Sequence, residues 1–302
     1  MDVQLADAIL ALTYHMGNTA QHFLDQARAL DEQGQAEAAI LAYHQAIAAN
    51  STWSIPHYNL GLIYKYQGDW QLSYQHNQKA TALDPDDEAA WWNLGIAATV
   101  LLDWKTAREA WNHFGLDIEV SEEELNMDLG NVPIRLNPDS DGEVVWCKRI
   151  DPARAVIYNI PLPACGHRYG DMILNDGAPQ GYRVSNGKEV PVFNELQLLT
   201  KSAYSTYSIV AHTEEQDDVD KLEELCHNAN IEFEDWSTVI LLCKQCSEGT
   251  PHETHDYDLK TDNGNERHIG LASTNKDTVI QILSDWRIIT LCEHTELELE
   301  LE

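Results

Sequence analysis

Apolar and polar residues follow two different periods along the chain. Between about residue 20 and residue 119, apolar side chains recur every three or four positions, which is the spacing of amphipathic helices. From residue 143 on, short apolar runs such as EVVWCKRI and ARAVIYNI are separated by turn residues, which is typical of strands. The pattern predicts an α+β multidomain chain with a helical first third and a β-rich remainder.

The helical part repeats itself. Gly61 in YNLGLIYKYQGDW corresponds to Gly95 in WNLGIAATVLLDW, 34 residues further on, and counting back by the same period reaches Ala27. Small residues at these positions let two helices approach closely, and Asp69 and Asp103 are placed to cap the second helix of their repeats. The sequence therefore predicts three stacked helical hairpins, preceded by a short amphipathic helix at the N-terminus.

These residues resemble the tetratricopeptide repeat (TPR) family over about residues 20–119. The resemblance implies a right-handed stack of antiparallel helix pairs, in which the first helix of each pair lines a concave face that binds an extended peptide or another domain. The partner-binding residues that it implies are Leu24, Arg28, Tyr58, Leu62, Lys65, Tyr66, Trp92 and Ile96. In the alternative interpretation, the aromatic members of this set are covered by the rest of the chain.

Some members of the family hold a C-terminal carboxylate with several lysine, arginine and asparagine side chains on this face. Asn59 and Asn93 fit that pattern, but most of the cationic positions do not. We therefore expect an aromatic and aliphatic groove rather than a carboxylate clamp.

After the helical repeats, the sequence pattern predicts a linker and then two β-containing domains. The helical repeat domain is placed at residues 1–119, and residues 120–142 are predicted to be a linker with one short helix near its start, because they are rich in acidic residues, Asn, Pro and Gly. Residues 143–202 carry short strand-like runs that predict a small β-barrel. Residues 203–302 give the order β-α-β, β-α-β with RIITLCEH as a strand, similar to a ferredoxin-like βαββαβ domain. A barrel followed by such a domain also resembles certain uncharacterised bacterial proteins, and that resemblance implies no activity.

One polar stretch, LLCKQCSEGTPHETHDYD, carries the candidate metal chemistry. Cys243, Cys246, His252 and His255 lie within residues 243–266, a loop that is long for a connection inside a ferredoxin-like domain. Two thiolates and two imidazoles suit a tetrahedral, structural zinc ion. A reactive dithiol and a solvated loop that binds no metal are the alternatives.

Charge and missing motifs exclude several functions. The net charge of −31 disfavours nucleic acid and anionic lipid as partners, since both need a basic patch. No stretch approaches the roughly 20 apolar residues of a membrane span, and the N-terminus lacks the basic region of a secretory signal, so we expect a cytoplasmic protein. The chain has no Walker loop, dinucleotide fingerprint or nucleophile elbow, and Cys165 and His167 are given a structural role in a loop.

The expected function is that of a non-enzymatic adaptor. Its TPR concave surface would bind a protein or peptide partner, with structural zinc as the candidate cofactor of the C-terminal domain. A regulatory protein that responds to a metal or a small ligand is the alternative.

Overall fold

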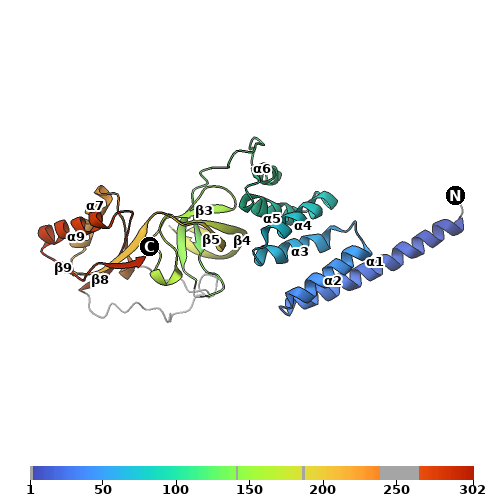
Figure 1. Ribbon diagram of the computed structural model, residues 1–302, viewed down its shortest axis with the longest axis horizontal. Helices are drawn as coiled ribbons and strands as arrows, with labels where there is room; N and C mark the ends of the chain where they lie inside the picture. The colour runs from blue at the N-terminus through green and yellow to red at the C-terminus, as the bar shows by residue number, and fades with distance from the viewer. Residues whose placement is uncertain (1–2, 141, 186–187, 239–264) are drawn as a thin grey trace. The chain divides into compact units, whose positions relative to one another are not determined.

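The computed structural model describes residues 3–140, 142–185, 188–238 and 265–302 (Figure 1). The chain divides into two compact units, unit 1 (Met1–Leu125) and unit 2 (Asn126–Glu302). Unit 1 is helical, and unit 2 holds two β-sheets with helices on one of them.

Unit 1 is a series of helical hairpins. Its helices are α1 (Val3–Glu32), α2 (Ala36–Ala49), α3 (Ser54–Tyr66), α4 (Trp70–Leu83), α5 (Glu88–Val100) and α6 (Trp104–His113). Helix α1 packs on α2, α3 on α4 and α5 on α6, and short turns join the members of each pair (Figure 1). Both α3 and α5, and α4 and α6, begin 34 residues apart. The predicted helical repeat is confirmed.

The close helix packing inside each hairpin depends on small side chains. A Cβ atom at Gly95 would lie 2.6 Å from the ring of Trp111, and one at Gly61 would lie 2.5 Å from the Asn77 amide. The predicted caps are present as well, since the Asp69 carboxylate accepts a hydrogen bond from the Leu72 backbone N–H, 3.1 Å away. The Asp103 carboxylate caps α6 in the same way. Side-chain capping and close helix approach therefore stabilise the second and third hairpins.

The first helix is longer than predicted. Instead of a short N-terminal helix and a separate first helix of the repeat, α1 is one continuous helix from Val3 to Glu32. Gly17 lies inside it. A single glycine costs a helix only about 1 kcal/mol relative to alanine, and no proline interrupts this helix.

The segment that follows α6 is held by side chains of that helix. The predicted short helix near residues 121–127 is absent. The buried Arg108 guanidinium donates hydrogen bonds to the backbone carbonyls of Glu119 and Glu123, 2.9 and 3.0 Å away. The Asn112 side chain donates to the Ile118 carbonyl and accepts from the Ile118 N–H. These bonds satisfy backbone groups that a helix would otherwise have paired.

The first part of unit 2 is a closed barrel. Its strands are β1 (Asn131–Arg135), β2 (Val144–Arg149), β3 (Arg154–Ile157), β4 (Met172–Ser185) and β5 (Lys188–Thr200), and the short 3₁₀ helix η1 (Pro163–Cys165) lies between β3 and β4. Consecutive strands pair antiparallel, and β1 closes the barrel by pairing in parallel with β5. Its core includes Ile134, Cys147, Ile157, Ile173 and Phe193.

Two strand assignments in this region need correction. Strand β1 lies inside residues 120–142, predicted as a linker, and pairs along its whole length with β2. The sequence of β1 does not show a strand pattern, because Asn131 and Pro133 are poor strand formers. The predicted strands in DMILND and GYRVSNG are joined in one strand, β4, over its bounds Met172–Ser185, because register shifts around Asn175 and Pro179 absorb the turn-like residues between them.

The second part of unit 2 is an antiparallel sheet. Its described elements are β6 (Ser205–His212), α7 (Gln216–Asn228), β7 (Glu232–Asp235), η2 (Trp236–Thr238), β8 (Glu266–Ser273), α9 (Lys276–Thr290), β9 (Glu293–His294) and β10 (Glu298–Leu301). The sheet order is β10-β6-β8-β7, and β9 also pairs with β6. Helices α7 and α9 cover one face (Figure 1), over a core that includes Leu222, Ile269, Leu271 and Trp286.

Only the first half of the run RIITLCEH is helical, and Glu293–His294 at its end form strand β9. Helix α9 begins at the Asn275 cap, whose side chain accepts hydrogen bonds from the N–H groups of Asp277 and Thr278, and continues to Thr290. Leu291 then ends it in the left-handed conformation, with φ of 62°. The β-branched Ile288 and Ile289 favour a strand, but packing of the helix on the sheet overrides their local preference.

Within unit 2, the barrel and the sheet share a boundary. The Trp236 indole N–H donates to the Ile160 carbonyl, 2.9 Å away, and its ring packs on Ile160 and Ala272. The Asn159 amide donates to the Glu234 carboxylate at 3.0 Å. Gly270 is required here, because a Cβ at this position would lie 2.4 Å from the Trp236 ring.

Candidate functional site

The first helices of the second and third hairpins form one continuous face. The Lys65 ammonium, on α3, donates a hydrogen bond to the Asn93 side chain on α5, 3.1 Å away, and lies 4.6 Å from the centre of the Tyr66 ring. Tyr58, Leu62, Lys65 and Tyr66 follow each other at spacings that place them on one side of α3. We call the surface formed by this side of α3 and the adjoining side of α5 the first-helix face.

Exposure separates the eight predicted partner-binding residues into three groups. Tyr66 is 61% exposed, and Arg28 is exposed as well. The half-buried group is Tyr58, Leu62 and Trp92, and the buried group is Leu24, Lys65 and Ile96. The surface open to a partner is therefore smaller than the sequence predicts.

The buried residues serve the packing of unit 1. Leu24 belongs to the core that α1, α2 and α3 share, and Ile96 is fully buried. Lys65 extends along the boundary between α3 and α5. Helical spacing shows which side of a helix a residue lies on, but not how deeply its side chain is buried. For this reason the sequence predicts these buried residues as partner-binding.

Trp92 packs inside the last hairpin, between α5 and α6. Its ring meets Trp111 and Phe114 edge to face, with ring centres 5.2 and 4.9 Å apart. The indole N–H groups of Trp92 and Trp111 are buried, and neither has a hydrogen-bond partner among the described residues. Trp92 therefore belongs more to the packing of α5 on α6 than to an open groove.

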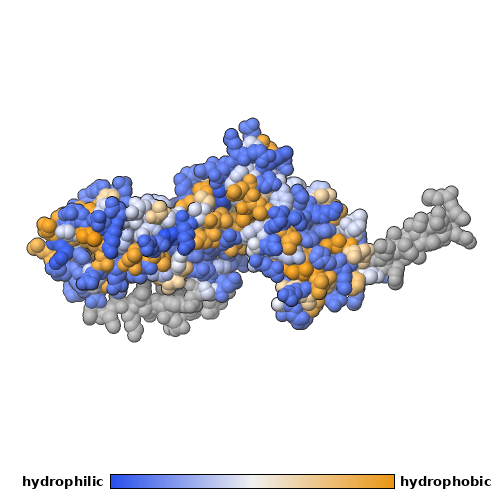
Figure 2. All heavy atoms as spheres, in the orientation of Figure 1, coloured by the Kyte–Doolittle hydropathy of each residue, from blue (hydrophilic) through white to orange (hydrophobic). Residues whose placement is uncertain are grey.

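Apolar residues also reach the surface elsewhere, in patches separated by hydrophilic residues (Figure 2). Outside the first-helix face, Leu41 on α2 is 67% exposed. Scattered apolar residues of this kind are normal on a protein surface, so exposure alone does not mark a binding site. No helix in the described ranges is both long and apolar enough to cross a membrane.

The predicted zinc ligands lie outside the described residues. This applies to Cys243, Cys246, His252 and His255 alike. In the part of the chain that the structure describes, no three His, Cys, Asp or Glu side chains are arranged to hold a metal ion. The described cysteines, Cys147, Cys165, Cys226 and Cys292, are free thiols.

Three histidines from neighbouring helices of unit 1 meet. The Nδ1 atoms of His57 and His76 are 3.1 Å apart, and the His44 and Tyr64 rings lie against that of His76. Burial, aided by the charges of His57 and His44, lowers the pKa of His76 to about 4. Burial, aided by Lys79 and His44, also lowers the pKa of His57. Both rings are therefore neutral at pH 7, and one can donate a hydrogen bond to the other.

We expect this cluster to make unit 1 less stable in acid. The pKa of His76 is about 4 in the folded chain and has its ordinary value of 6.5 in the unfolded chain, so between these values the unfolded chain binds more protons. The free energy of unfolding should fall by about 1–2 kcal/mol as pH drops through this window, after a discount for solvent screening. Chemical denaturation of the wild type and of His76→Phe at several pH values measures the effect. An equally steep pH dependence in His76→Phe would contradict this assignment.

A buried cluster in the barrel joins residues that the sequence did not connect. The His167 ring nitrogen Nε2 lies 2.7 Å from the Glu195 carboxylate of β5. His167 Nδ1 lies 3.0 Å from the backbone carbonyl oxygen of Cys165, at the end of η1, and the His167 backbone N–H donates to the Cys165 sulfur at 3.4 Å. The sequence showed Cys165 and His167 without a third group, because Glu195 comes from β5 and only the folded barrel brings it to His167.

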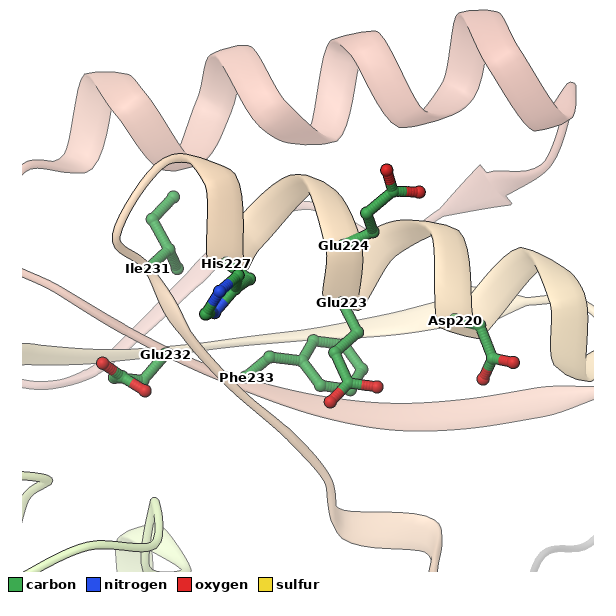
Figure 3. Close-up of a pocket in the computed structure, with 7 residues that line it drawn as sticks. All are labelled: Asp220, Glu223, Glu224, His227, Ile231, Glu232 and Phe233. Carbon is green, nitrogen blue, oxygen red and sulfur yellow. The ribbon is translucent and has the colours of Figure 1, made fainter.

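An open hollow of about 350 Å³ lies between α7 and β7. It is lined by Asp220, Glu223, Glu224 and Glu232, together with His227 and Phe233. In Figure 3, Glu223 and Glu232 lie on the side of α7 that faces Phe233, while Glu224 points away from them. A group of carboxylates favours a cation, but no other described feature here points to a ligand, and we assign this hollow no function.

Comparisons with known proteins give a limited result. No protein-family model matches the chain, and no curated protein matches it. Among solved structures, the second TPR of Spaghetti (RPAP3), bound to the HSP90 peptide SRMEEVD, is 19% identical over 38% of this chain and 98% of its own, with a TM-score of 0.35. The Arabidopsis OM64 TPR domain is 20% identical over 32% of this chain and 81% of its own, with a TM-score of 0.31.

Proposed function

We propose that unit 1 is a TPR-like binding module and that the chain acts as a non-enzymatic adaptor. The first-helix face would hold a segment of another protein. The observation that carries this proposal is the exposure of Tyr66, at 61%, beside the half-buried Tyr58 and Leu62 on the same side of α3. Tyrosine is among the residue types that contribute most binding energy at protein interfaces.

The chemistry of this face suggests the kind of partner. Tyr58, Leu62 and Tyr66 offer aromatic and aliphatic surface. A partner segment with apolar side chains spaced along an extended backbone fits such a surface. The net charge of −31 favours partners with basic residues near that segment, because opposite charges speed association.

Substitutions on α3 test the proposal. In Tyr58→Ser/Tyr66→Ser, loss of two aromatic contacts should reduce the captured partner at least about ten-fold, since an interface hot spot contributes about 2 kcal/mol or more. The measurement is quantitative affinity capture with the full chain, followed by direct binding of the captured partner. Leu41→Ser is the matched control, because Leu41 is about as exposed as Tyr66 but lies on α2. Equal capture by all three proteins would contradict the proposal.

The fold of the second half of unit 2 supports a further assignment. We propose that its sheet order β10-β6-β8-β7, with α7 and α9 on one face, is that of a ferredoxin-like domain. This domain and the barrel would give the adaptor a second surface. The fold itself implies no activity.

Structural zinc remains a proposal based on residue type and spacing. If Cys243, Cys246, His252 and His255 form a closed site, purified protein should hold about one zinc ion per chain, and chelation should lower its thermal stability. Elemental analysis measures the first and a melting curve the second, with Cys243→Ser/Cys246→Ser as the zinc-free control. Less than about 0.2 zinc per chain, with no change on chelation, would reject the site.

A further inference from the structure

We propose that the first half of α1, residues 3–16, pairs with the same segment of a second copy of this chain as a short parallel coiled coil. The proposal goes beyond the adaptor function and does not depend on it. Three features carry it. The apolar side of this segment continues the side of α1 that α2 covers, its apolar residues have the spacing of a two-stranded coiled coil, and it is nearly uncharged in a strongly acidic chain.

One apolar side runs along the whole of α1. In the second half of the helix, Ala20, Leu24 and Ala27 are buried on this side, and Leu24 and Ala27 share a core with Tyr43 of α2. Counting back from Ala20 in steps of four and three residues continues the same side. The residues reached in this way are Met16, Leu12, Ile9 and Leu5. The first half of α1 therefore carries the same kind of apolar side that packs on α2 in the second half.

Helix α2 covers only the second half of this side. Because α2 has 14 residues and α1 has 30, and both rise by the same distance per residue, α2 reaches about half-way along α1. In Figure 1, the first half of α1 extends past the end of α2, and no other labelled helix of unit 1 lies beside it. Among the described helices of unit 1, none therefore covers the apolar side of residues 3–16.

The spacing of the apolar residues points to a second helix as the partner. Leu5, Ile9, Leu12 and Met16 follow each other at steps of four, three and four residues, which is the alternation of the a and d positions in a heptad. The two leucines occupy d positions, and Ile9 occupies an a position. A β-branched residue at a with leucine at d favours two parallel strands over larger assemblies.

Charge favours a second copy of this chain as the source of that helix. The chain has a net charge of −31, so two copies repel each other over most of their surfaces. Between residues 3 and 16, Asp7 is the only Asp, Glu, Lys or Arg in the sequence, and helical spacing places it on the side opposite Ile9. Ala8 and Thr13, which flank the apolar side, are small and uncharged. Two copies can therefore approach each other here with little like-charge repulsion.

The pairing is weak and reversible because the segment is short. It holds about two heptads, fewer than the three or four of a sustained coiled coil, and spans about 20 Å. Interfaces at the small end of the size range belong to transient complexes, so we expect a dissociation constant on the order of 10 µM. A dimer of this kind carries two first-helix faces in one assembly, so a partner with two binding segments is held more tightly.

The test measures the average mass of the full chain by sedimentation equilibrium between about 1 and 200 µM, with a reducing agent present so that cysteines cannot join two chains. We expect the mass to rise from that of one chain toward that of two. In Ile9→Asp/Leu12→Asp, the dissociation constant should rise at least about ten-fold. Leu10→Asp/Tyr14→Asp adds the same charge away from the apolar side and is the matched control. A monomeric wild type, or a dimer that Ile9→Asp/Leu12→Asp weakens no more than the control does, overturns the proposal.

A cysteine at position 5 tests the parallel arrangement. In Leu5→Cys, mild oxidation should join two chains through residue 5, because a d position meets the same position of the partner strand in a parallel pair. Asp7→Cys is the control, since helical spacing places position 7 on the opposite side of α1. Peptide mass spectrometry identifies the bridge and separates it from bridges through the natural cysteines. We expect at least about ten-fold more bridge in Leu5→Cys than in Asp7→Cys, and equal amounts overturn the parallel pairing.

Discussion

Replacing Trp111 by alanine is expected to lower the free energy of unfolding of unit 1 by about 3–5 kcal/mol. Trp111 is fully buried on α6, its ring lies against Gly95 of α5, and Trp92 packs on it edge to face. Alanine would leave a cavity as large as the indole, in the place where the last hairpin is held together. Chemical denaturation followed by far-UV circular dichroism measures the loss, and hydrogen exchange of α5 and α6 locates it.

Two controls separate this effect from an ordinary loss of an apolar residue. Trp111→Phe should cost clearly less, because phenylalanine fills most of the space and removes a buried N–H that has no described partner. Leu102→Ala, at an exposed position between α5 and α6, should change stability by less than about 0.5 kcal/mol. If Trp111→Ala were no more destabilising than Leu102→Ala, the close packing of α5 on α6 would be contradicted.

Trp286→Ala should have an effect of similar size in unit 2, about 3–5 kcal/mol. Trp286 is fully buried on α9, and its indole N–H donates to the Asp218 carbonyl of α7, 2.8 Å away. It is therefore one of the side chains that join the two helices over the sheet. Hydrogen exchange should show α7 and α9 losing protection.

Ile288→Ala is the control for this second substitution. Ile288 lies on the same helix but is exposed, so its truncation should leave the exchange of α7 unchanged. Helices α3 to α6 belong to unit 1 and should keep their protection in both variants. Protection of α7 that survives in Trp286→Ala would show that the indole does not hold the two helices together.

The repeat could be read from the sequence because its physical cause is local. Gly61 and Gly95 are small where the helices meet, Asp69 and Asp103 cap the helix that follows, and each hairpin closes within a few dozen residues. Such short-range requirements leave a period in the sequence. The same argument explains why α1 was misjudged, since nothing local marks where its repeat begins.

The barrel and the His167–Glu195 pair inside it were harder to predict, because both depend on pairing between strands that are far apart in the sequence. Strand β1 is a strand through its pairing with β2 and β5, although its own residues favour a loop. Glu195 reaches His167 only after the barrel closes, and no spacing in the sequence reports this. The burial of a side chain cannot be read from helical spacing either. Lys65 and Ile96 are buried, although spacing predicts both on the partner-binding face.

The most direct test of the central claim is a cross-link from the first-helix face. A photoreactive phenylalanine analogue is placed at position 66 of the full chain, and the same analogue at position 41 serves as the control, since both positions are exposed. The proposed adaptor function predicts a discrete adduct with a partner protein from position 66 and none from position 41. No adduct at position 66, or the same adducts from both positions, would contradict it.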